Sequence, residues 1–281
     1  MDRSGRPKRL SLAFRVGLLL ALACTTLVGC SSSAACPAQP ITDPAEALEA
    51  LADRQKGWSS LKAEARVTQW ADRGRIRGTV LMFFERPAKV RFDVMSQFGP
   101  AAVLTSDGDS FQLSDLRAST FLHGPTCPEN IARLLGIAID GENLIRFLTG
   151  DTPLIAATTQ SMECRGGGYV LVLRAADNST QEIEIAIASE DRDKPAGAQR
   201  LTLVESSVLG PDGTLEWRAT YDGHEIFDGV VFPTDIRLVD YVNDADTQVR
   251  IKSVSVDPSV PAAAFRQEPR SGAQSEFAPC P

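Results

Sequence analysis

Two histidines are the first candidates for acid–base chemistry in this chain, because histidine gains or loses a proton near neutral pH. His123 ends a predicted strand beside Gly124-Pro125, and His224 stands in a predicted turn. Nucleophilic catalysis by serine needs a base placed beside the nucleophile, and the sequence contains no Gly-x-Ser-x-Gly. These contexts do not favour catalysis, and we expect a protein that is not an enzyme.

The carboxylate pairs and the possible metal ligands do not favour catalysis either. The pairs Asp107/Asp109 and Glu182/Glu184 are interpreted as a hairpin turn and as the solvated face of a strand. Zinc binding is an alternative use for the cysteines, but no Cys-x-x-Cys pair occurs and the histidines stand alone. We therefore predict neither a metal site nor a cofactor.

Cys30 has the clearest chemical context of the six cysteines. Five basic residues and one acidic residue precede an apolar stretch over 16–28, which is the pattern of an export signal. This stretch is shorter than the ~20 apolar residues that cross a bilayer. It ends in Leu27-Val28-Gly29-Cys30, which resembles the lipobox of bacterial lipoproteins, where the cysteine thiol takes a diacylglycerol and becomes the new N-terminus.

The lipobox implies a chain that is cut before Cys30 and held on a membrane by acyl chains, since two or more chains anchor a protein stably. The alternative is an ordinary cleaved signal whose small residues merely surround a cysteine. The Ser31-Ser32-Ser33 tether that follows favours the lipobox. By resemblance to the sorting rule of many Gram-negative lipoproteins, Ser31 in place of aspartate implies the outer membrane, with the protein on its periplasmic face.

The charge of the remaining chain excludes one class of partner. Without the five basic residues and one acidic residue of 1–29, residues 30–281 carry 24 Lys and Arg against 35 Asp and Glu, a net charge of −11. A nucleic-acid partner would require a basic stripe, so we expect none. The acidity also argues against a role that depends on adhering to anionic head groups, and we interpret it as an aid to solubility.

Four further cysteines remain in residues 31–281, and an even count in an oxidising compartment suggests two disulfides. They are Cys36, Cys127, Cys164 and Cys280. Three connectivities are possible, and the sequence does not choose among them. We favour Cys36–Cys280, which would tie the two tails, and Cys127–Cys164, which would bracket a helical segment.

Most of the chain is predicted to form strands. Apolar and polar residues alternate over 75–85 and 88–95, with a turn at Glu85-Arg86-Pro87-Ala88. Further strands are expected over 60–70, 101–106, 109–114, 119–123, 182–187, 214–222 and 249–256, with Asp107-Gly108 as a hairpin turn, Gly166-Gly167-Gly168 as a second turn and a bulge near Ser253. The expected total is about eleven strands.

Three short helices interrupt this pattern. Asp43-Pro44 supplies an N-cap and a first-turn proline for the first helix. Between residues 128 and 149 the apolar period changes and predicts two more helices, the second capped by Asp140 and ended by Gly150. The fold class is mainly β (α+β): a strongly curved antiparallel sheet that forms an unclosed β-barrel with lid or plug helices, which can leave an apolar cavity.

Three stretches together carry a family resemblance. They are Leu134-Leu135-Gly136-Ile137 with Leu144, Phe147-Leu148, Gly150 and Pro153; residues 92–99, Phe-Asp-Val-Met-Ser-Gln-Phe-Gly; and Tyr221-Asp222-Gly223 with residues 232–238. In order and spacing they resemble the lipoprotein-localisation factor superfamily, which comprises a periplasmic carrier (LolA-type) and an outer-membrane receptor (LolB-type), and are closest to the receptor. The resemblance covers about residues 45–265.

The resemblance implies an unclosed barrel whose cavity accepts the acyl chains of lipids or other lipoproteins, and a periplasmic carrier protein as a further partner. Phe98 would be the protruding residue that contacts membrane or ligand, where the receptor has leucine; the alternative is a turn residue folded back onto the barrel. Cavity or lid candidates, each with core packing as the alternative, are Met82, Phe83, Phe84, Phe92, Leu144, Phe147 and Leu148.

The expected organisation is a signal peptide over 1–29, a lipidated tether over 30–42, a LolA/LolB-like half-barrel over 43–265 and a loose tail over 266–281. The expected function is an outer-membrane lipoprotein that binds acyl chains, in lipoprotein localisation. The alternative is a non-enzymatic docking lipoprotein of an envelope machine, whose barrel is filled by its own side chains.

Overall fold

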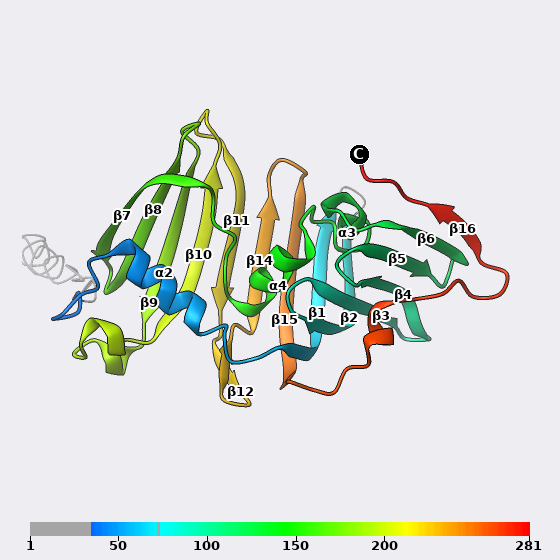
Figure 1. Ribbon diagram of the computed structural model, residues 1–281, viewed down its shortest axis with the longest axis horizontal. Helices are drawn as coiled ribbons and strands as arrows, with labels where there is room; N and C mark the ends of the chain where they lie inside the picture. Colours follow the sequence, from blue (N-terminus) through cyan, green and yellow to red (C-terminus); the bar gives the residue numbers. More distant parts are fainter. Residues whose placement is uncertain (1–34, 72–73) are drawn as a thin grey trace, which may run out of the picture. The chain divides into compact units, whose positions relative to one another are not determined.

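Fourteen strands form one sheet in the computed structural model, which describes residues 35–71 and 74–281 (Figure 1). The strand order is β16-β6-β5-β4-β3-β2-β1-β15-β14-β11-β10-β9-β8-β7. The sheet curves without closing, because its end strands β7 and β16 pair only with β8 and β6 among the described residues. The expected signal peptide, Cys30 and the first part of the tether lie outside the described residues.

The strands of this sheet have the following bounds: β1 (Ser60–Ala71), β2 (Gly74–Glu85), β3 (Lys89–Ser96), β4 (Gly99–Ser106), β5 (Ser110–Asp115), β6 (Thr120–Pro125), β7 (Ala157–Arg165), β8 (Gly168–Ala175), β9 (Thr180–Ile187), β10 (Leu201–Leu209), β11 (Leu215–Asp222), β14 (Asp235–Asp240), β15 (Ala245–Val256) and β16 (Gln274–Phe277). A separate hairpin pairs β12 (Glu225–Phe227) with β13 (Val230–Phe232). The helices are α2 (Pro44–Asp53), α3 (Pro128–Leu135) and α4 (Gly141–Thr149), with 3₁₀ turns η1 (Ser189–Asp191), η2 (Ala196–Ala198) and η3 (Ala262–Phe265).

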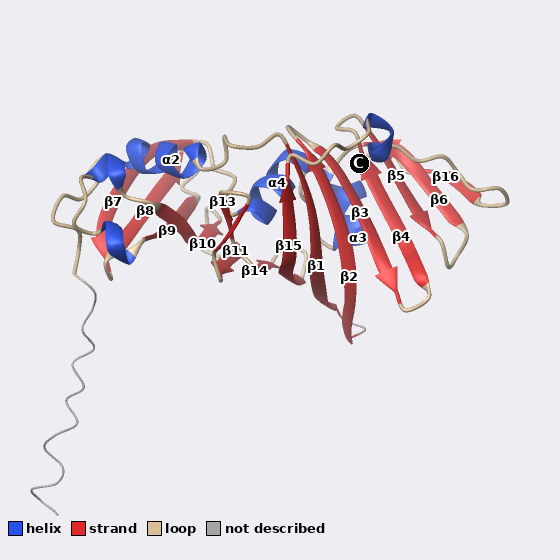
Figure 2. Ribbon diagram, turned by 90° about the horizontal axis from the view of Figure 1, so that it is seen from below, coloured by secondary structure: helices blue, strands red, loops and turns tan. Residues whose placement is uncertain are grey.

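The core lies between the helices and one face of the sheet, which we call the inner face (Figure 2). Directly opposed residues on neighbouring strands share a face, and Ala63, Met82, Phe92, Leu104 and Leu113 form one such row from β1 to β5. All five are buried. Each large apolar side chain buried in this way contributes about 1.5–3 kcal/mol. The period-two pattern of the sequence is therefore what fixes the inner face.

The three helices begin, and α4 also ends, where the sequence predicts. Asp43 caps α2 by accepting a hydrogen bond from Ala45 N, and Pro44 is its first residue. Asp140 caps α4 in the same way through Asn143 N. Gly150 ends α4 with a left-handed conformation, and an added Cβ there would lie 2.8 Å from Pro233 Cδ. The local capping chemistry thus determines these boundaries.

The disulfide pairing differs from the one favoured from the sequence. Cys36 pairs with Cys164 and Cys127 with Cys280, with Cα–Cα distances of 6.0 and 6.1 Å. The predicted pairs Cys36–Cys280 and Cys127–Cys164 are wrong because the sheet separates their partners. Cys164 lies on β7 at one end of the strand order, whereas Cys127 follows β6 at the other end.

The C-terminal segment is not the loose tail that we expected. It crosses the outer face of the sheet, where Arg91 donates to Ala264 O and Gln267 donates to Val103 O. It then forms β16, which runs parallel to β6. A four-residue strand gives little signal in sequence, because its alternation is too short to read.

The described residues hold sixteen strands rather than about eleven. The additional ones include the short pair β12 and β13 as well as β16. The predicted turns at Asp107-Gly108 and Gly166-Gly167 and the bulge near Ser253 are confirmed: opposite β1 the register slips between Ser253 and Ile251. In the described part of the chain, no helix has the length and apolar character needed to span a bilayer.

Candidate functional site

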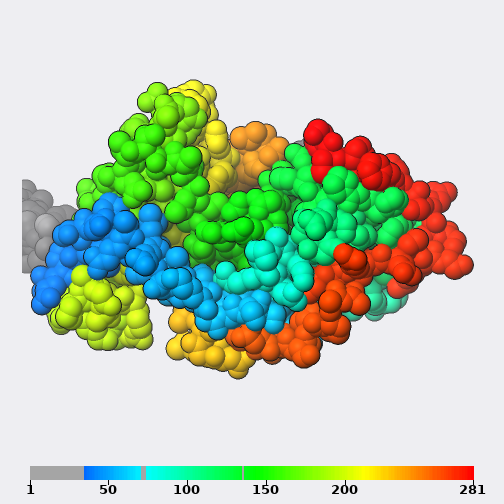
Figure 3. Space-filling model, viewed as in Figure 1, coloured from blue at the N-terminus to red at the C-terminus, as the bar shows by residue number. Residues whose placement is uncertain are grey.

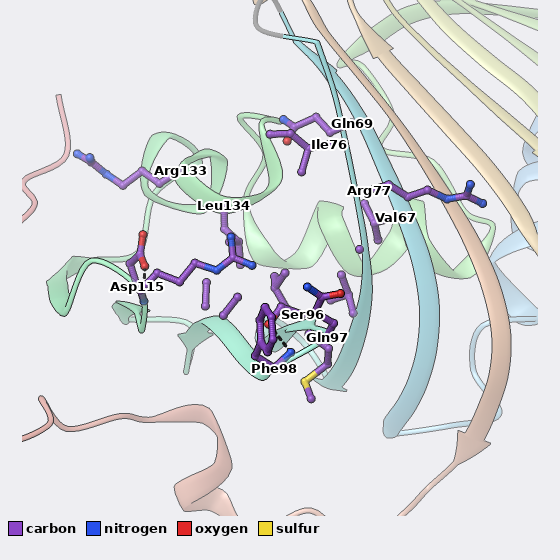
Figure 4. A pocket seen from close by; sticks show the side chains of 17 residues that line it. Val67, Gln69, Ile76, Arg77, Ser96, Gln97, Phe98, Asp115, Arg133 and Leu134 are labelled. Atoms are coloured by element: carbon purple, nitrogen blue, oxygen red, sulfur yellow. Dashed lines mark hydrogen bonds between the residues drawn. The ribbon is translucent and has the colours of Figure 1, made fainter.

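A pocket of about 710 Å³ opens at one end of the inner face (Figure 4). We call it the rim pocket, because it lies where β1 ends and β2 begins and beside the β3–β4 turn, at the same ends of these strands (Figure 2). Its apolar lining consists of Val67, Ile76, Val80, Val94, Met95, Phe98, Ala101, Ala102 and Leu134. Its other lining residues are Gln69, Arg77, Gly78, Ser96, Gln97, Asp115, Arg117 and Arg133.

Two exposed apolar side chains mark the mouth of the rim pocket. Phe98 is 89% exposed and Ile76 is 66% exposed. Ser96 fixes the turn that carries Phe98, because its hydroxyl accepts from Phe98 N and donates to Gly99 O. Figure 4 shows Leu134 pointing into the pocket, while the side chains of Arg77 and Arg133 extend away from it. The edge of the mouth is therefore apolar, and Asp115 and Arg117 also line the pocket.

Helix α3 forms the wall opposite the sheet and is fastened at both ends. At its start, Asn130 Nδ2 donates to Pro125 O (2.9 Å) and to Ala278 O (3.0 Å), next to the Cys127–Cys280 disulfide. At its end, Gly136 adopts a left-handed conformation directly against the Gln69 side chain, where a Cβ would not fit. This close approach places Leu134 over the strands.

A second pocket of about 240 Å³ lies beside the chain that connects α3 to α4. We call it the lid pocket, because its lining comes from the α3–α4 connection and α4 on one side and from β11 and β14 on the other. The lining residues are Pro128, Ile137, Ala138, Ile139, Asp140, Asn143, Phe147, Pro153, Trp217, Leu238 and Asp240. Figure 3 shows the α3–α4 segment, in green, lying across the middle of this face.

Helix α4 is held at its C-terminal end by charge and hydrogen bonds. Arg146 lies 3.4 Å from Asp151 Oδ2, and Tyr221 Oη donates to Asp151 O. Burial raises the pKa of Asp151, against the hydrogen bond from Thr152 N and the charges of Arg146 and Arg86, which lower it. The edge-to-face contact of Phe147 with Trp217, at 5.3 Å between ring centres, joins α4 to β11.

The architecture matches solved structures at low sequence identity. A LolA superfamily protein from Nitrosomonas europaea aligns over 81% of this chain and 98% of its own, at 10% identity and a TM-score of 0.52. A DUF1329 family protein from Desulfovibrio piger aligns over 83% and 100%, at 12% identity and a TM-score of 0.52. The chain has the fold of the LolA superfamily. No family model and no curated protein matches the sequence, so the likeness is one of fold and does not single out the LolB-type receptor.

Within this LolA fold, the predicted cavity and lid residues divide into three groups. Phe147 lines the lid pocket, and Phe98 lies at the mouth of the rim pocket. Phe83 faces outward, because its neighbours along β2 are buried on the inner face and Lys62 Nζ lies 5.7 Å from its ring centre. The remaining candidates are buried core residues: Met82, Phe84, Phe92, Leu144 and Leu148.

Sequence reasoning did not single out several residues that form the walls of the rim pocket. Gly78 is the clearest example, because a glycine inside a strand signals a close approach or an open space. An added Cβ there would meet only ordinary contacts, 3.8 Å from Met95 O and Val94 Cγ1. Met95 and Leu134 lie in stretches that carry the family resemblance, but the period of the sequence does not distinguish a pocket wall from core.

The two histidines lie in different surroundings. His123 stacks on Phe121 at 6.0 Å and meets the edge of Phe277 at 5.7 Å between ring centres. Burial lowers the pKa of His224, and the charge of Arg54 lowers it further. Among the residues that the structure describes, no group of three His, Cys, Asp or Glu could hold a metal ion.

Proposed function

We propose that this protein is a lipoprotein that holds an acyl chain of a lipid, or of another lipoprotein, in the rim pocket. The observation that carries this proposal is the pocket itself. Its volume of about 710 Å³ lies within the range of about 300–1,000 Å³ that is typical of small-molecule sites. Nine of its lining residues are apolar, and it opens beside the exposed Phe98.

The sequence supplies the cellular context of the proposal. Lipidation at Cys30 would hold the domain on a membrane, and Ser31 favours the outer membrane. A periplasmic carrier protein would then be the partner that delivers a lipoprotein. The LolA fold supports this context, since the family that the sequence resembles accepts acyl chains between sheet and helices.

Phe98 would contact the bilayer while the ligand moves between pocket and membrane. Phe98, 89% exposed, and Ile76, 66% exposed, line the same pocket mouth, and apolar side chains gathered on a surface mark ligand or membrane contacts. The alternative of a docking lipoprotein expects a filled half-barrel with Phe98 folded back onto it. The open rim pocket and the exposed Phe98 favour acyl-chain binding.

Titration of a fluorescent fatty acid into residues 35–281, which form one compact unit, tests the proposal. We expect saturable binding that palmitate competes away. Gly78→Phe should lower the affinity at least tenfold, because the ring would enter the rim pocket.

The matched control is Gly197→Phe, at an exposed glycine with no neighbouring atom within 4 Å of an added Cβ. It should bind as the unmodified protein does. Uptake that does not saturate, or equal affinities for the two phenylalanine variants, would contradict acyl-chain binding in the rim pocket.

A further inference from the structure

A second exposed apolar pair stands on the turn that joins β14 to β15 (orange, at the top of Figure 1). Tyr241 is 49% exposed and Val242 is 71% exposed. Neither residue lines the rim pocket or the lid pocket. Adjacent apolar side chains on a surface mark a contact with a ligand, a protein or a membrane, so this turn calls for a partner outside the domain.

The β14–β15 turn is held in shape by its own polar groups. Asp240 Oδ1 accepts hydrogen bonds from Val242 N and Asn243 N, both at 3.0 Å, and Oδ2 accepts from Asn243 Nδ2 at 2.7 Å. Tyr241 N donates to Glu216 O on β11 at 2.8 Å. The backbone of the turn therefore needs no partner, and what it leaves exposed is the apolar pair.

This turn lies at the same end of the strands as the turn that carries Phe98. The neighbours from β14 to β4 are all antiparallel, so β14 ends, β15 begins, β1 ends, β2 begins and β3 ends on one side. β1 and β2 lie between the two turns. Since neighbouring strands are about 4.8 Å apart, the turns are roughly 20 Å apart along the sheet.

We propose that the Tyr241–Val242 turn is a second contact with a lipid bilayer, so that the domain meets the membrane at two points. This inference rests on the proposed function, because it extends the bilayer contact proposed for Phe98. A stable protein interface buries about 800 Å² per partner around a continuous core. Two small apolar points that lie apart fit a fluid bilayer better, because lipids pack around each side chain separately.

The residue types of the turn specify the kind of lipid surface. Tyrosine has an apolar ring and a polar hydroxyl, and it is enriched where hydrocarbon meets water. Asp244 lies in the turn and Asp240 at its base, so an anionic lipid surface would repel this tip. The partner is therefore a zwitterionic bilayer, held by apolar contact rather than by charge.

Sedimentation of residues 35–281 with phosphatidylcholine vesicles tests the proposal. Tyr241→Ser combined with Val242→Ser should weaken vesicle binding at least tenfold, because two apolar side chains no longer enter the lipid. Phosphatidylglycerol added to the vesicles should not strengthen binding of the unmodified protein. The matched control is Ile226→Ser, which should bind as the unmodified protein does. Ile226 is 70% exposed on the β12–β13 hairpin, at the opposite ends of β11 and β14.

Tryptophan fluorescence gives a second readout at the same turn. Emission of Val242→Trp should shift to shorter wavelength with vesicles and should be quenched by brominated phosphatidylcholine, whereas Ile226→Trp should show neither effect. Vesicle binding that is equal for the double serine variant and the unmodified protein would overturn the second contact. So would dimerisation that the double variant abolishes, because it would assign the turn to a second copy of the chain.

Titration of a fluorescent fatty acid without vesicles separates this inference from the proposed function. The double serine variant should keep the unmodified affinity, since Tyr241 and Val242 line neither pocket. If fatty acid binds but the double variant keeps its vesicle binding, the second contact fails and the rim pocket stands. If vesicle binding depends on Tyr241 and Val242 but no fatty acid binds, the rim pocket fails and the second contact stands.

Discussion

The inner face of the sheet is fully covered in one part of the molecule and partly open in another. We call strands β7–β10 with helix α2 the filled wing. Its side chains Leu171, Ile183 and Leu203 are at most 1% exposed. We call strands β1–β5 with helix α3 the open wing. Its side chains Val67 and Val94 are only partly buried and border the rim pocket. Both wings have strands with alternating apolar residues. The difference therefore comes from the helix that covers each wing.

Helix α2 packs closely because the segment before it is fastened to the sheet. Cys36 is bonded to Cys164 on β7, and Ile41 N donates to Tyr169 Oη at 2.8 Å. Tyr169 in turn donates to Gln199 Oε1. Helix α3 is fastened at its ends, and its partly buried Leu134 lies over the pocket. The two covering helices also differ in length, with ten residues in α2 and eight in α3.

The largest expected effect is the loss of a disulfide. Replacing both cysteines of either pair with serine should lower the free energy of unfolding by about 2–5 kcal/mol, because each bond closes a long loop in the unfolded chain. The sequence separations are 128 and 153 residues. Denaturant unfolding measures the loss.

The two disulfides should differ in their effect on fatty-acid binding. Removing Cys36–Cys164 acts on the filled wing and should leave the affinity unchanged. Removing Cys127–Cys280 frees the start of α3 and should alter the affinity. The reverse pattern would contradict the assignment of one disulfide to each wing.

A leucine from each covering helix gives the next comparison. Leu51 of α2 is 6% exposed, and Leu51→Ala should cost about 2–5 kcal/mol of unfolding free energy through the cavity that it leaves. Leu134 of α3 already borders open space, so Leu134→Ala should cost less than about 1 kcal/mol. Thermal and denaturant unfolding of the two variants measure both values. Equal losses would show that the open wing is packed as tightly as the filled wing.

The open wing also carries a titratable clamp for the C-terminal segment. Burial raises the pKa of Asp107, but hydrogen bonds from Ser110, Asp109 and Arg266 outweigh this and lower it from 3.8 to about 2. A carboxylate whose pKa is lowered by folding stabilises the protein above its unfolded pKa. This stabilisation is lost as the pH falls from about 4 to about 2, and it amounts to about 2 kcal/mol.

Asp107→Asn should therefore be less stable by about 2 kcal/mol at neutral pH and about equal to the unmodified protein at pH of about 2. Urea unfolding across this pH range provides the measurement. Asp109→Asn is the control, because Asp109 lies in the same turn and the ion pair with Arg266 is made by Asp107. A loss that is independent of pH would exclude the charged clamp.

The smallest effect on stability is expected at Phe98. Phe98→Ser should change the free energy of unfolding by less than about 0.5 kcal/mol, since the side chain is exposed. It should nevertheless weaken binding of residues 35–281 to phospholipid vesicles. Ile226→Ser is the matched control, because Ile226 is 70% exposed on the separate β12–β13 hairpin. Equal losses of vesicle binding would remove the special role of Phe98.

The sequence predicted the elements of this fold better than their long-range partners. Local chemistry at Asp43, Asp140 and Gly150 determines helix ends, and alternation determines the inner face of β2 and β3. The disulfide partners depend on the order of fourteen strands, which no local pattern encodes. The sequence did not predict the rim pocket either, because Val94 at its wall and Phe92 in the core belong to the same alternating strand.

The most direct test of the account is to find where an acyl chain lies. Residues 35–281 would be labelled with a fatty acid that carries a photoreactive diazirine at its chain end, and the crosslinked residues mapped by mass spectrometry. Acyl-chain binding in the rim pocket predicts crosslinks on residues 76–80 and 94–102, which excess palmitate and Gly78→Phe both suppress. Crosslinks confined to the filled wing or to the outer face, unaffected by Gly78→Phe, would contradict it.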